Sequence, residues 1–214
     1  MGKPDTSCDV EPELLAGWLA ARSIARGLPL PVPDSGGLRV DTGSDIEVSR
    51  YVFAGPVPEI RELARSITAP RIFIKMIGPA EQLLELVPPA WRLQPGAHLM
   101  IHDGRRDARP ALPIGYRVEL AAGGFTTVVR IFSVDGDLAA SGYAAEYNGI
   151  FIFDRIIVEE AHRRRGLGKA MMAVLGTAQR SRATRRVLVA TDAGRALYST
   201  LGWTVIAPYS TVVI

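Results

Sequence analysis

The sequence has little cysteine and no long apolar run. Cys8 is the single cysteine among 214 residues, so an internal disulfide framework cannot form and a reducing compartment is expected. It lies in residues 1–12, which we expect to be a flexible N-terminus. No apolar run approaches the ~20 residues of a membrane-spanning helix, and the acidic N-terminus lacks the apolar core of a secretory signal. The sequence therefore predicts a cytoplasmic protein with no membrane partner.

Excess charge and metal-ligand patterns are also scarce. The net charge is only +3, although basic residues gather between positions 155 and 186. No aromatic residue lies between 154 and 197 to stack on bases, so a nucleic-acid partner is not expected. His98 and His102 are four residues apart, but they lie in a predicted strand and have no third ligand candidate nearby. We expect no metal site.

The most informative stretch is residues 151–170. Residues 152–158 are apolar and rich in β-branched side chains, which indicates a buried strand. A basic loop and two glycines follow, and apolar residues then recur at helical spacing. The N-terminus of such a helix offers free backbone N–H groups and the positive end of its dipole, and both favour anions. Gly166 and Gly168 would let a phosphate approach the backbone.

Two familiar phosphate-binding patterns do not fit this loop. A P-loop ending at residues 168–169 needs glycine at 163 and Ser or Thr at 170, whereas the chain has Arg163 and Ala170. A dinucleotide fingerprint starting at Gly166 needs a small residue at position 171, where Met171 stands. An ordinary solvated turn that opens a helix is the alternative to a phosphate site.

The segment RRRGLG at 163–168 matches Arg-x-x-Gly-x-Gly/Ala and resembles the acetyl-CoA-binding motif of the GCN5-related N-acetyltransferase (GNAT) superfamily. The segment ALYSTLGW at 196–203 resembles the family's A-x-x-x-Y-x-x-x-G-F segment in its Leu-Tyr and Leu-Gly-Trp elements. The resemblance covers about residues 114–214. It implies an α/β (α+β) fold with a mixed, mostly antiparallel sheet flanked by helices, and acetyl-CoA as cosubstrate.

The resemblance also implies a coenzyme site. The backbone of residues 156–158 would pair with the pantetheine amides and offer an N–H to the oxyanion of the reaction. Thr191 stands where the family commonly has asparagine and keeps a hydroxyl for the pantetheine. The coenzyme-binding residues implied are Ile156, Ile157, Val158, Arg163, Arg164, Arg165, Gly166, Leu167, Gly168, Lys169, Ala170 and Thr191.

Three residues are candidates for catalysis. By its place in the second motif Tyr198 would donate a proton to the leaving thiolate; the alternative is a tyrosine that only packs in the core. Strand alternation places Asp154 on the same face as Ile156 and Val158, and family members often carry a carboxylate there that deprotonates the amine through water. The alternative for Asp154 is a structural ion pair with a neighbouring arginine. Glu146 is the second candidate base.

The rest of the chain divides into two parts at the polar segment 104–113. Residues 13–103 are predicted to form an N-terminal α/β lobe, with helices at 13–27, 59–67 and 80–87 and strands at 38–42, 47–53, 71–77 and 97–102. The order strand, helix, tryptophan, strand in 71–102 echoes 186–214, so this lobe could be a degenerate GNAT-like half.

Residues 114–214 are predicted to form the acetyl-CoA-binding domain, with strands at 116–121, 126–134, 138–147, 150–158, 186–191, 203–206 and 210–214. Asp192 is the predicted N-cap of a helix at 193–201. The family usually has two helices between its first and second strands, but only residues 122–125 are available here. We therefore expect the N-terminal lobe to shape the acceptor cleft.

These observations favour an N-acetyltransferase that moves an acetyl group from acetyl-CoA to a primary amine by direct attack, with a small molecule as the acceptor. Two alternatives stay open, a non-catalytic sensor that binds acyl-CoA and a protein-lysine acetyltransferase. A homodimer also stays open.

Overall fold

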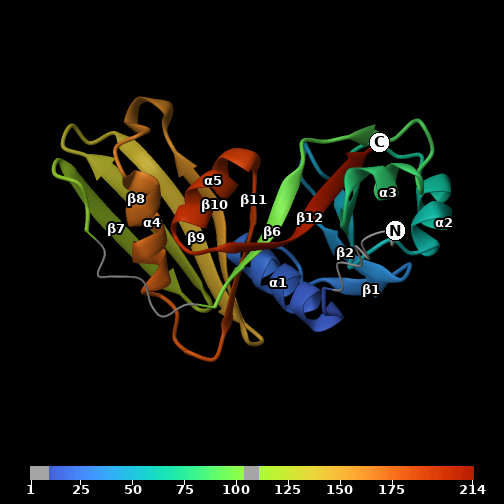
Figure 1. The fold of residues 1–214 in the computed structure, drawn as a ribbon, viewed down its shortest axis with the longest axis horizontal. Coiled ribbons are helices and arrows are strands. Elements are labelled where there is room, and N and C mark those ends of the chain that lie inside the picture. Colours follow the sequence, from blue (N-terminus) through green and yellow to red (C-terminus); the bar gives the residue numbers. More distant parts are fainter. Residues whose placement is uncertain (1–9, 104–110) are drawn as a thin grey trace, which may run out of the picture.

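The computed structural model describes residues 10–103 and 111–214, so Cys8 and most of the predicted boundary at 104–113 lie outside the described residues. Within the described part, twelve strands form one mixed, mostly antiparallel sheet with helices on both faces (Figure 1). The strand order is β1-β2-β3-β4-β12-β6-β11-β10-β9-β8-β7, and β5 pairs with β12 outside this path. The predicted α/β class is confirmed. No helix in the described ranges is long and apolar enough to cross a membrane.

The first half of the chain contains three helices and six strands among its described residues. They are α1 (Pro12–Ala25), β1 (Val32–Asp34), β2 (Gly37–Asp41), β3 (Ser49–Phe53), α2 (Glu59–Ser66), β4 (Ile72–Ile77), α3 (Ala80–Leu84), β5 (Arg92–Leu93) and β6 (Ala97–His102). The second half contains β7 (Tyr116–Gly123), β8 (Thr126–Ser133), β9 (Leu138–Tyr147), β10 (Ile150–Val158), the 3₁₀ helix η1 (Glu160–His162), α4 (Leu167–Gly176), β11 (Arg185–Ala190), α5 (Asp192–Thr200) and β12 (Thr204–Val213).

The predicted elements are present with small shifts at their ends, but the prediction of two strands at the C-terminus is wrong. A single strand, β12, covers that region. A bulge between Val205 and Ala207 bends it, so that residues 204–209 pair with β6 and residues 209–213 pair with β4. The strand thus changes partner along its length. It continues through Pro208, whose carbonyl accepts the backbone N–H of Gly78. The short strands β1 and β5 were not predicted.

Each half of the chain contributes a strand to the other half. β6 lies between β11 and β12, and β12 lies between β4 and β6, with antiparallel pairing throughout. The unit of strand, helix and parallel strand also occurs twice, as β3-α2-β4 and as β10-α4-β11. The hydrogen-bonded sheet is therefore continuous across the predicted boundary. That the first half is a degenerate GNAT-like half is a proposal that this repeated topology supports.

The helices cover the two faces of the sheet unequally. Leu188 and Met100 pack with α4, and Val212 packs with α2 and α3, so these helices lie on one face. Val187 and Tyr209 point to the opposite face, where α1 packs on β8, β9 and β10. Figure 1 shows α1 as the helix on this second face, between the two ends of the elongated molecule.

Helix α1 covers β8, β9 and β10 on the face of the sheet opposite α4. β7 and β8 are joined by a tight turn, as the short segment 122–125 predicts. The inner face of α1 (Leu14, Trp18, Ala21 and Ala25) is buried against the sheet. Gly17 permits this close contact, because a Cβ there would lie 2.7 Å from Cγ1 of Ile150.

We predict that Gly17→Val destabilises the protein by about 1–3 kcal/mol, because the added side chain pushes α1 away from β10. A matched control is Gly55→Val, since a Cβ at Gly55 meets nothing within 4 Å. The control should change the free energy of unfolding by less than about 0.5 kcal/mol. Urea unfolding of both variants measures the difference, and equal effects would show that α1 does not depend on this contact.

Candidate active site

The site begins where β10 and β11 separate. These parallel strands pair at only three positions, from Ile150–Arg185 to Ile152–Val187, although both continue further. The related pair β3 and β4 stays paired over five positions along the whole of β3. A split between parallel strands leaves backbone N–H and C=O groups without a sheet partner on the facing sides, and these can pair with an extended ligand. Of the two parallel strand pairs among the described residues, only β10 and β11 separate in this way.

A bulge in β10 shapes the edge of this split. The register between β10 and β9 shifts between Asp154 and Ile157, and Arg155 adopts a left-handed conformation with φ of 49°. The side chain of Asp154 therefore faces α1, whereas Ile156 and Val158 pack against the core beneath α4. The prediction that Asp154 shares a face with Ile156 and Val158 is wrong, because the extra residue of a bulge breaks strand alternation.

The basic loop leads directly into the N-terminus of α4. Arg164 and Gly166 both adopt left-handed conformations, with φ of 63° and 81°, and they turn the chain so that the helix starts at Leu167. Within the described part of the chain no side chain caps this helix. Its first-turn N–H groups and its dipole are therefore available to an anion. This geometry is compatible with a pyrophosphate site at residues 163–170, which stays a prediction.

Neighbouring side chains hold the basic loop in place. Arg165 donates from Nη1 to the Tyr116 hydroxyl at 3.1 Å, and the same hydroxyl lies 3.1 Å from Nδ1 of His162. Arg163 donates from Nε to the Val158 carbonyl at 3.2 Å. Tyr116 thus links both ends of the loop to β7. Sequence reasoning did not identify Tyr116, because no motif marks a tyrosine about fifty residues before the loop.

The two glycines of the motif have different surroundings. A Cβ at Gly166 would meet only Pro113, at 3.9 Å, so this side of the loop is open among the described residues. A Cβ at Gly168 would lie 2.7 Å from Cδ2 of Leu197. Gly168 therefore lets α4 pack closely against α5, while Gly166 alone has the free space that the sequence interpretation assigned to both.

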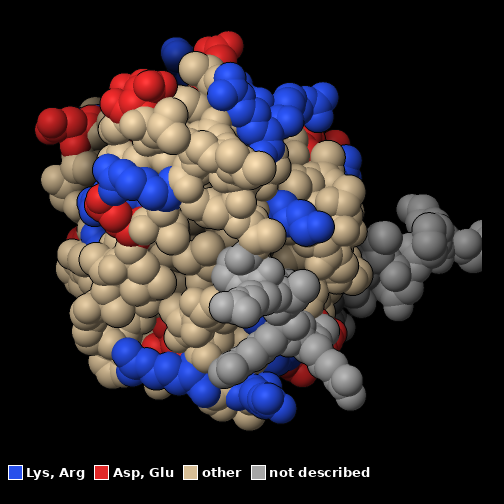
Figure 2. All heavy atoms as spheres, turned by 90° about the vertical axis from the view of Figure 1, so that its left-hand side faces the viewer, with Lys and Arg blue, Asp and Glu red and all other residues tan. Residues whose placement is uncertain are grey.

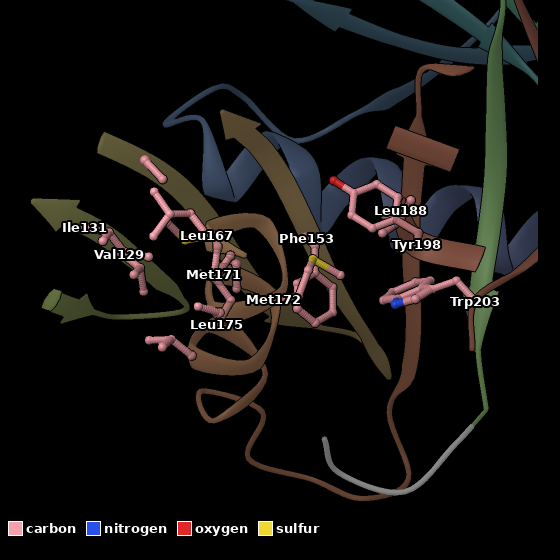
Figure 3. Close-up of a cluster of buried hydrophobic side chains, with 14 of the residues drawn as sticks. Val129, Ile131, Phe153, Leu167, Met171, Met172, Leu175, Leu188, Tyr198 and Trp203 are labelled. Atoms are coloured by element: carbon pink, nitrogen blue, oxygen red, sulfur yellow. The ribbon is translucent and has the colours of Figure 1, made fainter. Parts of the chain in front are cut away.

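Tyr198 lies beside the split, on α5. Its ring is buried and packs against Trp203, with 6.3 Å between ring centroids, and Trp203 in turn packs against Phe153. Figure 3 shows the hydroxyl pointing away from Trp203. Burial, and secondly the charge of Asp154, raise the pKa of Tyr198 to about 12. The phenol therefore keeps its proton at neutral pH, as a proton donor must.

Asp154 forms an ion pair with two arginines of α1. Arg26 donates to both carboxylate oxygens, at 2.6 and 2.8 Å, and Nε of Arg22 lies 3.6 Å away. Burial alone would raise the pKa of Asp154, but the hydrogen bonds from Arg26 and the charges of both arginines outweigh it and lower the pKa. A carboxylate with a lowered pKa and both oxygens bonded is a weak base. The geometry is that of the ion-pair alternative, and a role as base stays a prediction.

Glu146 lies away from the split. It is paired with Phe151, at the end of β10 where β10 and β11 are still joined. Its carboxylate accepts the backbone N–H groups of Arg180, at 2.5 Å, and of Ser181, at 3.0 Å. In this structure Glu146 holds the loop that follows α4.

The start of α5 differs from the prediction. Thr191, not Asp192, is the N-cap, because its hydroxyl accepts the Gly194 N–H at 3.3 Å. Asp192 instead lies 2.8 Å from Nε2 of His98, and His102 packs beside Trp203. Among residues 10–103 and 111–214 no group of three His, Cys, Asp or Glu side chains could hold a metal ion.

The charges at the end of the sheet nearest β7 do not form one continuous basic surface. Figure 2 shows Lys and Arg side chains in separate groups on this face, with acidic side chains beside several of them.

We predict that Asp154→Asn destabilises the protein by about 3–5 kcal/mol at neutral pH, because Arg22 and Arg26 lose their buried counter-charge. The pKa of Asp154 is lower in the folded state, so its contribution is fully present above the unfolded pKa of about 4 and is lost as pH falls through the folded value. The difference between wild type and variant should therefore shrink below about pH 4.

Asp41→Asn is the control, since Asp41 pairs with Arg39 at the surface and should contribute no more than about 1 kcal/mol. Urea unfolding at several pH values measures both. A constant difference between wild type and Asp154→Asn across the acid range would contradict the assignment.

Comparisons with known proteins agree with this geometry. Residues 126–205 match the family model of the acetyltransferase (GNAT) domain. The fold is similar to that of a GCN5-related N-acetyltransferase from Kribbella flavida, with a TM-score of 0.62, 18% identity, and coverage of 92% of this chain and 95% of that chain. It is also similar to a structure assigned to the GNAT family from Novosphingobium aromaticivorans, with a TM-score of 0.61, 16% identity, and coverage of 95% and 98%.

A third similar structure is a tandem GNAT protein from the clavulanic acid biosynthesis pathway, with a TM-score of 0.53, 13% identity, and coverage of 72% of this chain and 66% of that chain. No curated protein matches the sequence. The structural likenesses show the fold, and the match at 126–205 spans the bulged strand, the basic loop, α4 and Tyr198. Residues 126–205 therefore carry an acetyltransferase (GNAT) domain, which lies in a sheet that both halves of the molecule share.

Proposed function

We propose that the protein transfers an acetyl group from acetyl-CoA to a primary amine of a small molecule by direct attack. The observation that carries this proposal is the split between β10 and β11, with an anion-binding helix start at one end and the Tyr198 hydroxyl beside it. The three features fit the pyrophosphate, the pantetheine and the thioester of one extended coenzyme.

The coenzyme would bind through backbone groups at two places. The pyrophosphate would accept the first-turn N–H groups of α4 and the charges of Arg163, Arg164 and Arg165. The pantetheine would lie along residues 156–158, where β10 has lost β11 as a neighbour. The same edge offers a backbone N–H to the oxyanion that forms on the thioester carbon.

The chain's own residues would manage the protons of the reaction. A neutral amine attacks the thioester carbon, the new C–N bond forms, and the C–S bond breaks as the tetrahedral oxyanion collapses. Tyr198 would give its proton to the departing sulfur, and its raised pKa suits a group that must be protonated first. The amine's extra proton would leave to solvent or to a carboxylate. For the latter role Asp154 is the candidate beside the split.

One observation favours the alternative of a sensor that binds acyl-CoA without turnover. Both candidate bases are engaged, since Asp154 is held by Arg26 and Glu146 by two backbone N–H groups. Thioester consumption over a broad panel of amines, including a lysine-containing peptide, separates the alternatives. Coenzyme binding with no turnover would favour the sensor, and turnover with the peptide alone would favour a protein acceptor.

We predict that Tyr198→Phe lowers kcat about 10²–10⁴-fold, because the leaving thiolate loses its proton donor, while the Kd for acetyl-CoA is unchanged. Tyr147→Phe is the control, since Tyr147 packs on Phe125 at the closed end of β10. Initial rates with a thiol reagent and titration calorimetry give the two quantities. An unchanged kcat in Tyr198→Phe would leave this residue a packing role only.

A second prediction concerns the basic loop. Arg164→Glu should weaken acetyl-CoA binding about tenfold or more, because it places a negative charge beside the pyrophosphate. Arg182→Glu makes the same charge change at an exposed position beyond the other end of α4 and should leave the Kd nearly unchanged. Calorimetry at two salt concentrations measures both. Equal losses would mean that only net charge matters and that the loop is not the phosphate site.

A further inference from the structure

A buried polar cluster lies on the α1 face of the sheet, next to Asp154 and between the two halves of the molecule. Four of its side chains are cationic: Arg22 on α1, Arg26 directly after α1, Arg50 on β3 and Lys75 on β4. Glu47, just before β3, and Tyr209 on β12 complete it. We call these six residues the inter-half cluster.

The cluster contains more positive than negative charge. Glu47 pairs with Arg50 and lies 3.6 Å from Nζ of Lys75. Asp154, at the edge of the cluster, pairs with Arg26 and Arg22. Two carboxylates therefore face four cationic side chains. Arg50 and Lys75 are only 4% and 8% exposed, so solvent does little to screen the excess.

Two polar groups of the cluster are poorly satisfied. Nη1 of Arg22 and the hydroxyl of Tyr209 are buried and form no well-aligned hydrogen bond with the described residues, although the Arg22 guanidinium lies beside the Tyr209 hydroxyl. A buried donor without a good acceptor costs free energy, and so does a buried charge without a counter-charge. A further acceptor group would reduce both costs.

The titration behaviour of the cluster agrees with a missing anion. Burial, and then the charge of Arg22, lower the pKa of Arg50 to about 10. Burial lowers the pKa of Lys75 to about 7; Glu47 acts against this change, and the charges of Arg22, Arg50 and Arg26 add to it. With Lys75 partly neutral, the excess lies between one and two positive charges. A single carboxylate matches it.

We infer that the inter-half cluster binds a carboxylate of the acceptor, so that the substrate is an amine that also carries a carboxylate group. The inference rests on the proposed function and deepens it. Asp154 connects the two places, since it is held by Arg22 and Arg26 of the cluster and its charge acts on Tyr198 beside the split. A carboxylate held on the α1 face would anchor one end of the acceptor while its amine points to the thioester.

Matched pairs of acceptors test this inference. Each pair is an ω-amino acid and its primary amide, such as 4-aminobutanoate and 4-aminobutanamide, over three chain lengths. The amino acid should have a kcat/KM at least about tenfold above that of its amide at the best length, with the difference mainly in KM. Equal values for both members at every length would overturn the inference.

Variants of two cluster residues test whether the preference for the amino acid over its amide depends on the cluster. Tyr209→Phe removes only a buried, poorly satisfied hydroxyl, so the fold should persist, and Arg50→Gln removes one charge. Each should reduce the ratio of kcat/KM between amino acid and amide by about tenfold, while the Kd for acetyl-CoA is retained as evidence of folding. Arg182→Gln, at an exposed position outside the cluster, should keep the wild-type ratio. If both cluster variants kept the wild-type ratio of kcat/KM between amino acid and amide, the assignment would be contradicted.

Thermal unfolding measured without coenzyme distinguishes a failure of this inference from a failure of the proposed function. Glutarate should raise the Tm of the wild-type protein, whereas glutaramide at the same concentration and ionic strength should not, and Tyr209→Phe should show a smaller shift. If no amine consumes thioester but glutarate still stabilises, the carboxylate site stands and the transferase proposal fails. If turnover occurs and glutarate gives no specific shift, the carboxylate site is refuted.

Discussion

The structure depends on the exchange of two strands between its halves. β6 of the first half pairs with β11, and β12 of the second half pairs with β4, so neither half completes its own sheet. These antiparallel ladders satisfy backbone groups that would otherwise form exposed edges. They also fix the position of everything attached to the sheet. Helix α1 can therefore cover strands that occur more than a hundred residues later, and bring its arginines to the bulge of β10.

The two halves share a topology but differ where chemistry would occur. The first half keeps β3 and β4 paired along the whole of β3, and it has no counterpart of the bulge or of the basic loop among its described residues. In the second half β10 and β11 separate after three pairs, and the bulge directs successive side chains to new faces. We propose that the first half now serves as a wall, supplying α1 and the cationic side chains opposite Asp154.

The bulge also joins the α4 face of the sheet, with the proposed coenzyme site, to the α1 face, with the proposed acceptor site. On the α4 face, Ile156 and Val158 support the helix whose N-terminus faces the proposed pyrophosphate. On the α1 face, Asp154 holds Arg26 and Arg22 in the inter-half cluster. Since Asp154 also contributes to the raised pKa of Tyr198, the charge state of the cluster and the proton donor are coupled through one carboxylate.

Local pattern in the sequence determined the identity of most elements and the position of the basic loop before α4. Turn residues, apolar periodicity and the RRRGLG segment act over a few residues, so β9 and β10 were predicted at their observed bounds. The tertiary structure alone decided the partners. Asp154 meets Arg26 across 128 residues, Gly168 meets Leu197, and β12 crosses from β6 to β4. Such contacts depend on the face of the sheet that each helix covers and on a bulge that breaks strand alternation. Neither feature can be read from a short-range sequence pattern.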